Sequence, residues 1–227
     1  MFTLTPIILA LGYAFLMMQF SVWRSKKTLR EQSSPMTHPA ILRQTARLAA
    51  ALEVDRIKVN LLEMDAVNGL AAPDGQIYLT RGFIAAHARG EVSETELAAV
   101  IAHELGHVAL GHSRRRMIDF TGQNAVFMVL SGILNRFLPI IGIWIARLIS
   151  TALMARLSQR DEYEADAYAT ALLNKAGIGA GPQISLFEKL EALTGNRGNT
   201  ALWLASHPPS AARIAAIRAR EQKWSKT

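Results

Sequence analysis

The stretch that decides the fold covers residues 91–112 and reads EVSETELAAVIAHELGHVALGH. Its residues are mostly apolar, which is typical of a helix that runs through a protein core. Ser93 followed by Glu96 three residues later forms a capping box, a pattern that marks the start of a helix. Within the helix, residues 103–107 have the pattern His-Glu-x-x-His. We therefore expect a buried helix that carries a chemical site.

Two histidines four residues apart lie on one face of a helix, about one turn from each other. This spacing allows His103 and His107 to bind a single zinc ion. Glu104 lies beside His103 and projects towards the same cleft, where it can accept a proton from a zinc-bound water. A five-residue pattern also arises by chance, so the prediction of an enzyme depends on a third ligand elsewhere in the chain.

The composition of the 227 residues limits the classes of protein that need to be considered. Half of the residues are hydrophobic and 19% are charged, which suits one core with membrane-associated segments. There is no cysteine, so any metal must be bound by His, Asp or Glu. The net charge of +7 suits an anionic membrane surface or simply a solvated basic face. No basic patch is interleaved with aromatic residues, so nucleic acid is not expected as a partner.

The segment from Leu4 to Trp23 contains no charged residue and is long enough to span a bilayer as a helix. Four basic residues follow it within 24–30, and none precedes it. The positive-inside rule then predicts a single-pass N-terminal anchor in the cell inner membrane, with the rest of the chain in the cytoplasm. The alternative is a buried core helix.

Three short strands are predicted before the histidine helix, at 57–62, 67–71 and 76–80, with a turn at 73–75. They suggest a small antiparallel sheet. Because the remaining patterns are helical, the predicted fold class is mainly α with a small antiparallel β-sheet, an α+β fold with an N-terminal transmembrane helix.

The stretch 124–157 is strongly apolar, but Arg136, Pro139 and Arg147 interrupt it. We interpret it as two apolar helices joined near 135–139. One alternative is a shallow membrane hairpin whose arginines reach the headgroups. The other is a helical subdomain packed on the catalytic core or on the first segment.

A catalytic zinc site needs three protein ligands and one open position. The sequence DEYEAD, within a predicted helix at 158–176, offers Glu162, Glu164 and Asp166. Glu162 and Asp166 are four residues apart and share a helical face, whereas Glu164 points elsewhere. One of the pair can bind the metal, and the other can accept a hydrogen bond from the free ring nitrogen of a ligand histidine.

Three motifs in this order, HELGHVALGH, SQRDEYEAD and SHPPSAARI, resemble the HtpX-like and CaaX-prenyl-endopeptidase-like zinc metallopeptidases of metallopeptidase family 48. VNGLAAPDGQIYLTRG resembles the edge-strand region of the same family. The resemblance covers about residues 40–217 and implies a gluzincin-type core, with Glu162 as the third zinc ligand and Asp166 as the partner of a ligand histidine. The chain departs from the family at Gln159, where an arginine is usual, at Gly69, where an alanine is usual, and in its shorter apolar region.

Two further parts of the chain are candidates for contacts with a substrate. An exposed strand beside the zinc can pair with an extended peptide, and Asn68, Gly69 and Ala71 are our candidates for that surface, unless the strand is covered. His207 is a candidate oxyanion donor, a fourth ligand in a resting state, or a cap packed against prolines. His112 lies five residues after His107, off the ligand face, and is expected on the surface.

Together these expectations describe a membrane-anchored zinc metalloendopeptidase with one zinc ion per chain and Glu104 as the general base. Its expected parts are an anchor (1–23), a basic and polar linker (24–39) and a metallopeptidase domain (40–227). Membrane or misfolded proteins are the expected substrates, and membrane lipid is a further partner. The alternatives are a zinc-stabilised adaptor without proteolytic activity and a zymogen-like peptidase that cleaves only itself.

Overall fold

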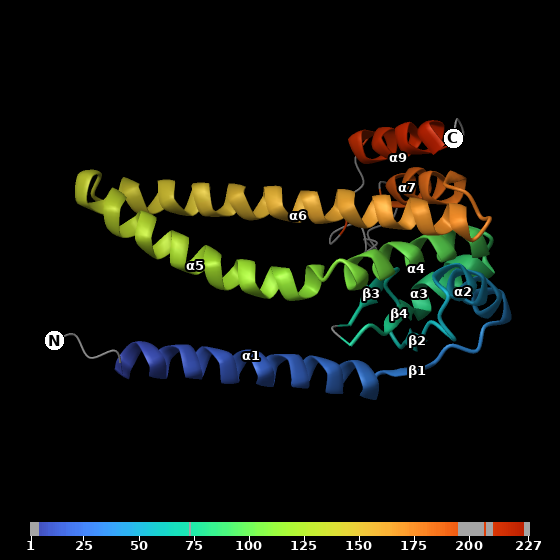
Figure 1. Ribbon diagram of the computed structural model, residues 1–227, viewed down its shortest axis with the longest axis horizontal. Coiled ribbons are helices and arrows are strands. Elements are labelled where there is room, and N and C mark those ends of the chain that lie inside the picture. Colours follow the sequence, from blue (N-terminus) through green and yellow to red (C-terminus); the bar gives the residue numbers. More distant parts are fainter. Residues whose placement is uncertain (1–4, 73, 195–206, 208–210, 225–227) are drawn as a thin grey trace.

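The computed structural model describes residues 5–72, 74–194, 207 and 211–224 (Figure 1). The chain is mainly helical with one small sheet, as predicted. The helices are α1 (Thr5–Glu31), α2 (Pro39–Leu52), α3 (Arg81–Ala88), α4 (Glu94–Ala109), α5 (His112–Phe137), α6 (Ile141–Lys175), α7 (Gly181–Thr194) and α9 (Ala211–Trp224). The strands are β1 (Ser33–Pro35), β2 (Val59–Leu62), β3 (Gly69–Ala71) and β4 (Ile77–Thr80).

The sheet is mixed, so the prediction of an antiparallel sheet is wrong. Its strand order is β1-β2-β4-β3; β4 pairs parallel with β2, and the other two pairs are antiparallel. Every residue of β4 is buried, which favours the central position that β4 takes between β2 and β3. β1 lies in the stretch that was expected to be a linker, and its Pro35 is tolerated because β1 is an edge strand.

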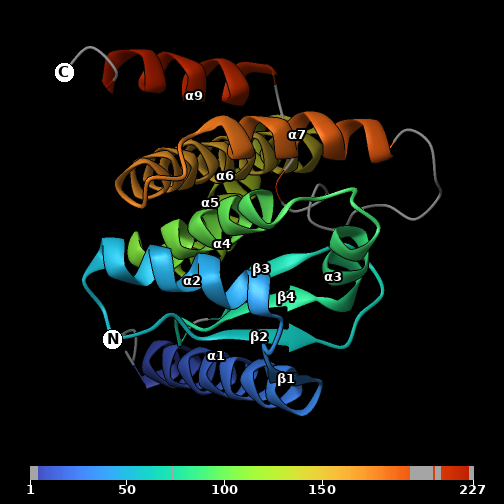
Figure 2. The ribbon, with the colours of Figure 1, turned by 90° about the vertical axis from the view of Figure 1, so that its right-hand side faces the viewer.

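Helix α4 runs through the core, between the sheet on one side and α6 and α7 on the other (Figure 2). The predicted capping box is present: the Glu96 amide donates to Ser93 Oγ, and the Ser93 amide donates to the Glu96 carboxylate. Leu97, Val100 and Ile101 are completely buried. Contacts with the sheet on one face and with α6 and α7 on the other therefore fix the position of α4 and make a rigid site possible.

Two glycines allow other backbones to approach α4 closely. A Cβ atom at Gly106 would lie 3.0 Å from the Cα and carbonyl oxygen of Ala165, so α4 and α6 touch with no side chain between them. A Cβ atom at Gly69 would lie 2.7 Å from Val100 Cγ1, so β3 lies directly against α4, about one turn before His103. The two contacts fix α6 and the sheet edge next to the residues of the His-Glu-x-x-His pattern.

The apolar stretch forms two helices, α5 and α6, which pack against each other and join at residues 138–140, close to the predicted position. The predicted separate helix at 158–176 is instead the second half of α6, which continues unbroken for 35 residues. The α5–α6 hairpin and α1 extend from the core in the same direction (Figure 1). Large apolar side chains on the hairpin are exposed, among them Ile140 at 79% and Trp144 at 68%.

Among the described residues, one helix is long and apolar enough to cross a membrane by length and composition, and it is α6. The segment that was predicted to be the anchor forms most of α1, but several of its side chains lie outside the described residues. Its crossing of a membrane stays a prediction.

The carboxylate of Glu96 also joins α4 to α7. Although buried, it accepts hydrogen bonds from Ser185 Oγ at 2.6 Å and from Lys189 Nζ at 2.9 Å. Burial alone would raise the pKa of Glu96, but the hydrogen bonds from Lys189, Ser185 and Ser93 more than offset this and hold the pKa below its usual value.

We predict that Glu96→Gln lowers the free energy of unfolding by about 1–3 kcal/mol at pH 7, because Ser185 and Lys189 lose the charged acceptor that the buried carboxylate provides. The folded pKa is below the unfolded one, so the contribution of the carboxylate is present above the unfolded pKa and is lost as the pH falls through the folded pKa. In urea unfolding, the difference between wild type and variant should therefore shrink below about pH 4.

The matched control is Glu94→Gln in the same helical turn, where the carboxylate forms an exposed ion pair with Arg43. We expect this change to alter stability by less than about 0.5 kcal/mol. Equal urea midpoints for wild type and Glu96→Gln at pH 7 would show that the buried carboxylate does not hold α4 and α7 together.

Candidate metal centre

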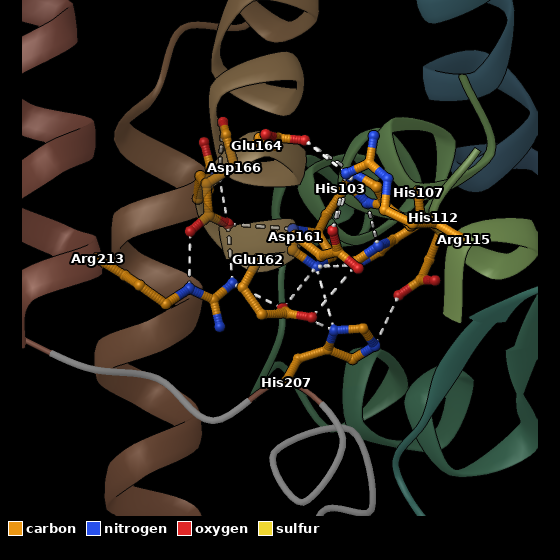
Figure 3. Close-up of polar contacts among 12 residues, drawn as sticks. His103, His107, His112, Arg115, Asp161, Glu162, Glu164, Asp166, His207 and Arg213 are labelled. Atoms are coloured by element: carbon orange, nitrogen blue, oxygen red, sulfur yellow. Dashed lines mark hydrogen bonds and ion pairs between the residues drawn. The ribbon is translucent and has the colours of Figure 1, made fainter. Parts of the chain in front are cut away.

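Four side chains from three parts of the chain meet in the core (Figure 3). His103 and His107 come from α4, Glu162 comes from α6, and His207 comes from the segment before α9. All four are buried. Each offers one nitrogen or oxygen atom to a common centre, and these atoms lie within 4.8 Å of one another.

The distances within this cluster fit a tetrahedral metal site. The Nε2 atoms of His103 and His107 are 3.1 Å apart, and they lie 3.3 and 3.5 Å from the two carboxylate oxygens of Glu162. Ligand atoms placed about 2.0–2.1 Å from a zinc ion at tetrahedral angles are separated by roughly 3.3 Å. Two imidazole nitrogens that face each other at this distance repel through their lone pairs unless a proton or a metal ion lies between them. The donor set therefore fits a divalent metal.

The charges in the cluster also favour a cation. Burial lowers the pKa of His103, but hydrogen bonds to Asp166 and Glu162 outweigh it and raise the pKa to about 9. Burial would raise the pKa of Glu162, but its contacts with His103 and His207 hold that pKa far below its usual value. The carboxylate of Glu162 thus stays ionised in a buried place, where positive charge is stabilising.

Asp166 contacts the other side of His103. Its Oδ1 lies 3.1 Å from His103 Nδ1, so the ring presents its remaining nitrogen, Nε2, to the cluster. Glu162 and Asp166 both face the cluster from α6, whereas Glu164 contacts Arg160 and Arg115 instead. This is the division of faces that their spacing predicts.

Arg213 belongs to the site, although the sequence analysis did not single it out. Its Nε and Nη2 atoms donate to the two oxygens of Asp166 at 2.7 and 2.9 Å, and Nη2 lies 3.4 Å from Glu162 Oε2. The guanidinium is buried and lies over the ring of Phe187. In the sequence it is one of several basic residues of the last helix. Its place in the motif SHPPSAARI and the apolar Ile214 and Ile217 beside it were the signals that could have found it.

His112 is buried, so the prediction that it lies on the surface is wrong. That prediction assumed a continuous helix, but Gly111 adopts a left-handed conformation (φ 69°), where α4 ends and α5 begins. The change of direction places His112 Nδ1 2.8 Å from His107 Nδ1.

Glu104 and His207 lie next to each other at the cluster. Glu104 is buried on α4, and its Oε1 is 3.6 Å from His207 Nε2. His207 Nδ1 is 2.8 Å from Glu162 Oε2 and 3.3 Å from His103 Nε2. The ring of His207 is thus part of the polar cluster.

The strand residues considered for substrate contacts lie beside this cluster and outside it. β3 is one of the two outer strands of the described sheet and pairs with β4 alone among the described residues. Gly69 is buried against Val100, whereas Asn68 and Ala71 are half-buried. Asn68 Oδ1 has no hydrogen-bond partner in the part of the chain that the structure describes.

Comparison with known proteins gives consistent results. The chain is 33% identical over 154 residues to Metalloprotease LoiP of Escherichia coli (strain K12), covering 68% of this chain and 58% of that protein. It is 31% identical over 157 residues to Metalloprotease YcaL of the same organism, with the same coverage of 68% and 58%. It is 28% identical over 195 residues to Mitochondrial metalloendopeptidase OMA1 of Schizosaccharomyces pombe, covering 81% of this chain and 53% of that protein.

The chain matches just over half the length of each of these curated relatives. The family model for Peptidase family M48 matches residues 35–221, a range that contains all four members of the cluster. The chain therefore belongs to the M48 family of metallopeptidases.

Proposed function

We propose that this protein is a membrane-anchored zinc metalloendopeptidase with a gluzincin-type core, in which His103, His107 and Glu162 bind one zinc ion. The observation that carries the proposal is the convergence of two Nε2 atoms and one carboxylate at distances of 3.1–3.5 Å in a buried place. Zinc suits a set of nitrogen and oxygen donors with tetrahedral spacing. Membership of a metallopeptidase family supports the same conclusion.

When bound, zinc supplies Lewis-acid polarisation of a peptide carbonyl and activation of a water molecule. Glu104 accepts the proton of the attacking water and later delivers it to the leaving amine. Glu104 is buried beside the proposed ligand histidines, where such a proton acceptor is needed. A purely structural zinc site would not need this carboxylate, because no water proton is transferred there. Asp166 holds His103 in the orientation that leaves Nε2 towards the cluster.

His207 is proposed to donate a hydrogen bond to the oxyanion that forms on the substrate. Its Nδ1 contacts Glu162 at 2.8 Å, and its Nε2 is directed towards Glu104. The role of fourth ligand in a resting state uses Nδ1, whereas the role of donor uses Nε2. The remaining alternative, a simple cap on a loop, does not explain why the ring is buried between Glu104 and Glu162.

We propose that an extended polypeptide binds along the outer edge of β3 by adding a strand to the sheet. Three observations support this: β3 is an edge strand, it touches α4 at Val100, and Asn68 Oδ1 lacks a partner among the described residues. Asn68 and Ala71 then contact the substrate, and Gly69 keeps the edge close to α4. Pairing through the backbone suits substrates of varied sequence, such as membrane or misfolded proteins.

The membrane part of the proposal rests on α1 and the α5–α6 hairpin, which extend from the core in one direction (Figure 1). Both carry exposed apolar side chains, as at Trp23 and Trp144, which a packed subdomain leaves unexplained. We propose that α1 anchors the chain in a cell inner membrane with the core in the cytoplasm, and that the hairpin enters the same bilayer. Leu153, which is exposed on α6, is nine residues from Glu162, or about 14 Å along the helix. We therefore expect the metal centre to lie near the membrane surface.

The zinc ligands can be tested by metal analysis. We predict that the purified protein binds one zinc ion per chain and that His103→Ala, His107→Ala and Glu162→Gln each abolish stoichiometric binding, because three ligands are required. Mass spectrometry of desalted protein measures the metal content. Glu188→Gln, which removes an exposed carboxylate of α7, is the control and should keep one zinc ion. Full zinc content in Glu162→Gln would exclude this residue as a ligand.

The role of Glu104 separates an enzyme from an adaptor. We predict that Glu104→Gln keeps zinc and the fold but reduces the cleavage of fluorescent casein by about 10²–10⁴-fold, since an amide cannot accept the water proton. Chelation should abolish wild-type cleavage, and added zinc should restore it. Wild-type turnover in zinc-loaded Glu104→Gln would show that Glu104 is not the base, and a zinc-loaded wild type that cleaves no polypeptide would support the adaptor.

The hairpin can be tested apart from α1 by deleting residues 1–23. We predict that the shortened protein still binds liposomes, more strongly when they contain anionic lipid, because apolar side chains and arginines lie together on the hairpin. Replacing Phe137, Ile140 and Trp144 with serine should leave it in the bottom fraction of a flotation assay, apart from the liposomes. The control is Leu42→Ser with Val54→Ser, which replaces two exposed apolar residues outside the hairpin and should leave liposome binding intact. If the shortened protein does not float before these changes, the hairpin is not a membrane element.

A further inference from the structure

The second ligand histidine, His107, has an unusual neighbour. Its Nδ1 lies 2.8 Å from Nδ1 of His112, a fully buried side chain at the start of α5. We infer that His112 is a positioning residue that orients His107 for metal binding and passes the hydrogen bond on to the carboxylate of Glu164 on α6. This inference rests on the proposed function, because it takes His107 as a metal ligand.

The ring protons can be assigned from the geometry. His107 Nε2 faces His103 and Glu162, so its lone pair must be free to bind a metal and the ring proton must be on Nδ1. His107 Nδ1 then donates to His112 Nδ1, which is the acceptor. A neutral His112 ring therefore carries its own proton on Nε2. If His112 Nδ1 were instead the donor of this hydrogen bond, the ring proton of His107 would be on Nε2, where it would prevent metal binding.

His112 Nε2 has acceptors where this assignment requires them. It lies 3.3 Å from Glu164 Oε2 and 3.7 Å from Asp161 Oδ1 (Figure 3). The closer contact is to Glu164, so His112 Nε2 donates its hydrogen bond to that carboxylate. Each ring nitrogen of His107 and His112 is then either a hydrogen-bond donor, a hydrogen-bond acceptor or free to bind a metal, and both ring protons have an acceptor.

The three residues His112, Asp161 and Glu164 are close enough to hold a second metal ion, but a cation already lies among them. Arg115 Nη1 is 3.1 Å from Asp161 Oδ1 and 3.2 Å from Glu164 Oε2. His112 Nδ1 is also occupied by its contact with His107. The guanidinium therefore takes the place that a metal would need, and the arrangement serves to hold His112.

The two ligand histidines are consequently oriented in different ways by the same helix. Asp166 contacts His103 directly, whereas Glu164 reaches His107 through the intervening ring of His112. The left-handed turn at Gly111 is what brings His112 beneath His107. Helix α6 thus supplies one proposed metal ligand and the carboxylates behind both of the others.

Substitutions at His112 can separate its two hydrogen bonds. Asparagine places an acceptor near the position of Nδ1 and can keep the bond from His107. Glutamine places its amide near the position of Nε2, so it can reach Glu164 but leaves His107 Nδ1 without its acceptor. Leucine removes both contacts. The three variants of the full-length protein therefore form a graded series.

We expect His112→Gln and His112→Leu to weaken zinc binding by about 10–100-fold, as is usual when the partner of a ligand histidine is lost. His112→Asn should stay within about threefold of wild type. Competition with a chromophoric chelator measures the dissociation constant. The visible absorption bands of the cobalt-substituted proteins report ligand geometry and should match wild type only in the asparagine variant. Melting temperatures of the metal-free proteins show whether folding is affected; if the leucine variant does not fold, the comparison of glutamine with asparagine still decides.

Three outcomes would overturn the inference. The first is wild-type zinc affinity in His112→Gln, and the second is an equal loss in His112→Asn and His112→Gln. The third is a wild-type protein with two zinc ions, one of which is lost on replacing His112, since this would assign a second metal site. A wild-type protein that binds no zinc would instead overturn the proposed function together with this inference.

Discussion

The site depends on one contact, the direct approach of α4 and α6 at Gly106 and Ala165. A Cβ atom at position 106 would meet the Ala165 backbone at 3.0 Å, so any larger residue would push the helices apart. Gly106 lies between His103 and His107 in sequence, and Ala165 lies between Glu162 and Asp166. Contact at this point brings the histidines of one helix within 3.1–3.5 Å of the carboxylates of the other. A wider separation of the helices would move the histidines and the carboxylates apart and so disturb the spacing of the proposed ligands.

The cluster also explains why so many charged groups are buried together. An isolated buried carboxylate is strongly destabilising, but Asp166 is paired with Arg213, and Glu162 is in contact with His103 and His207. Arg115 has the same function for the buried carboxylate of Asp161. In the proposed holoenzyme, the metal ion provides the positive charge that the centre of this arrangement favours. The same long helix α6 carries the exposed apolar surface of the hairpin, which links the position of the centre to the proposed membrane contact.

Local patterns in the sequence predicted the parts of the structure that depend on neighbouring residues. The capping box of Ser93 and Glu96 predicted the start of α4, and the spacing of Glu162 and Asp166 predicted their common face. The features that were missed depend on contacts distant in sequence. The parallel pairing of β2 with β4 depends on the central position of β4 in the sheet. The role of Arg213 depends on its contact with Asp166, which is 47 residues away in the sequence. His112 was misplaced because a helical spacing rule was applied across Gly111, where the helix ends.

The central claim is that two imidazoles of α4 and one carboxylate of α6 bind the same zinc ion, and X-ray absorption spectroscopy at the zinc edge tests it most directly. We predict a first shell of nitrogen and oxygen atoms alone at about 2.0–2.1 Å. We also predict the outer-shell scattering of at least two imidazole rings in the zinc-loaded wild-type protein. A spectrum that shows the scattering of fewer than two imidazole rings would contradict the claim.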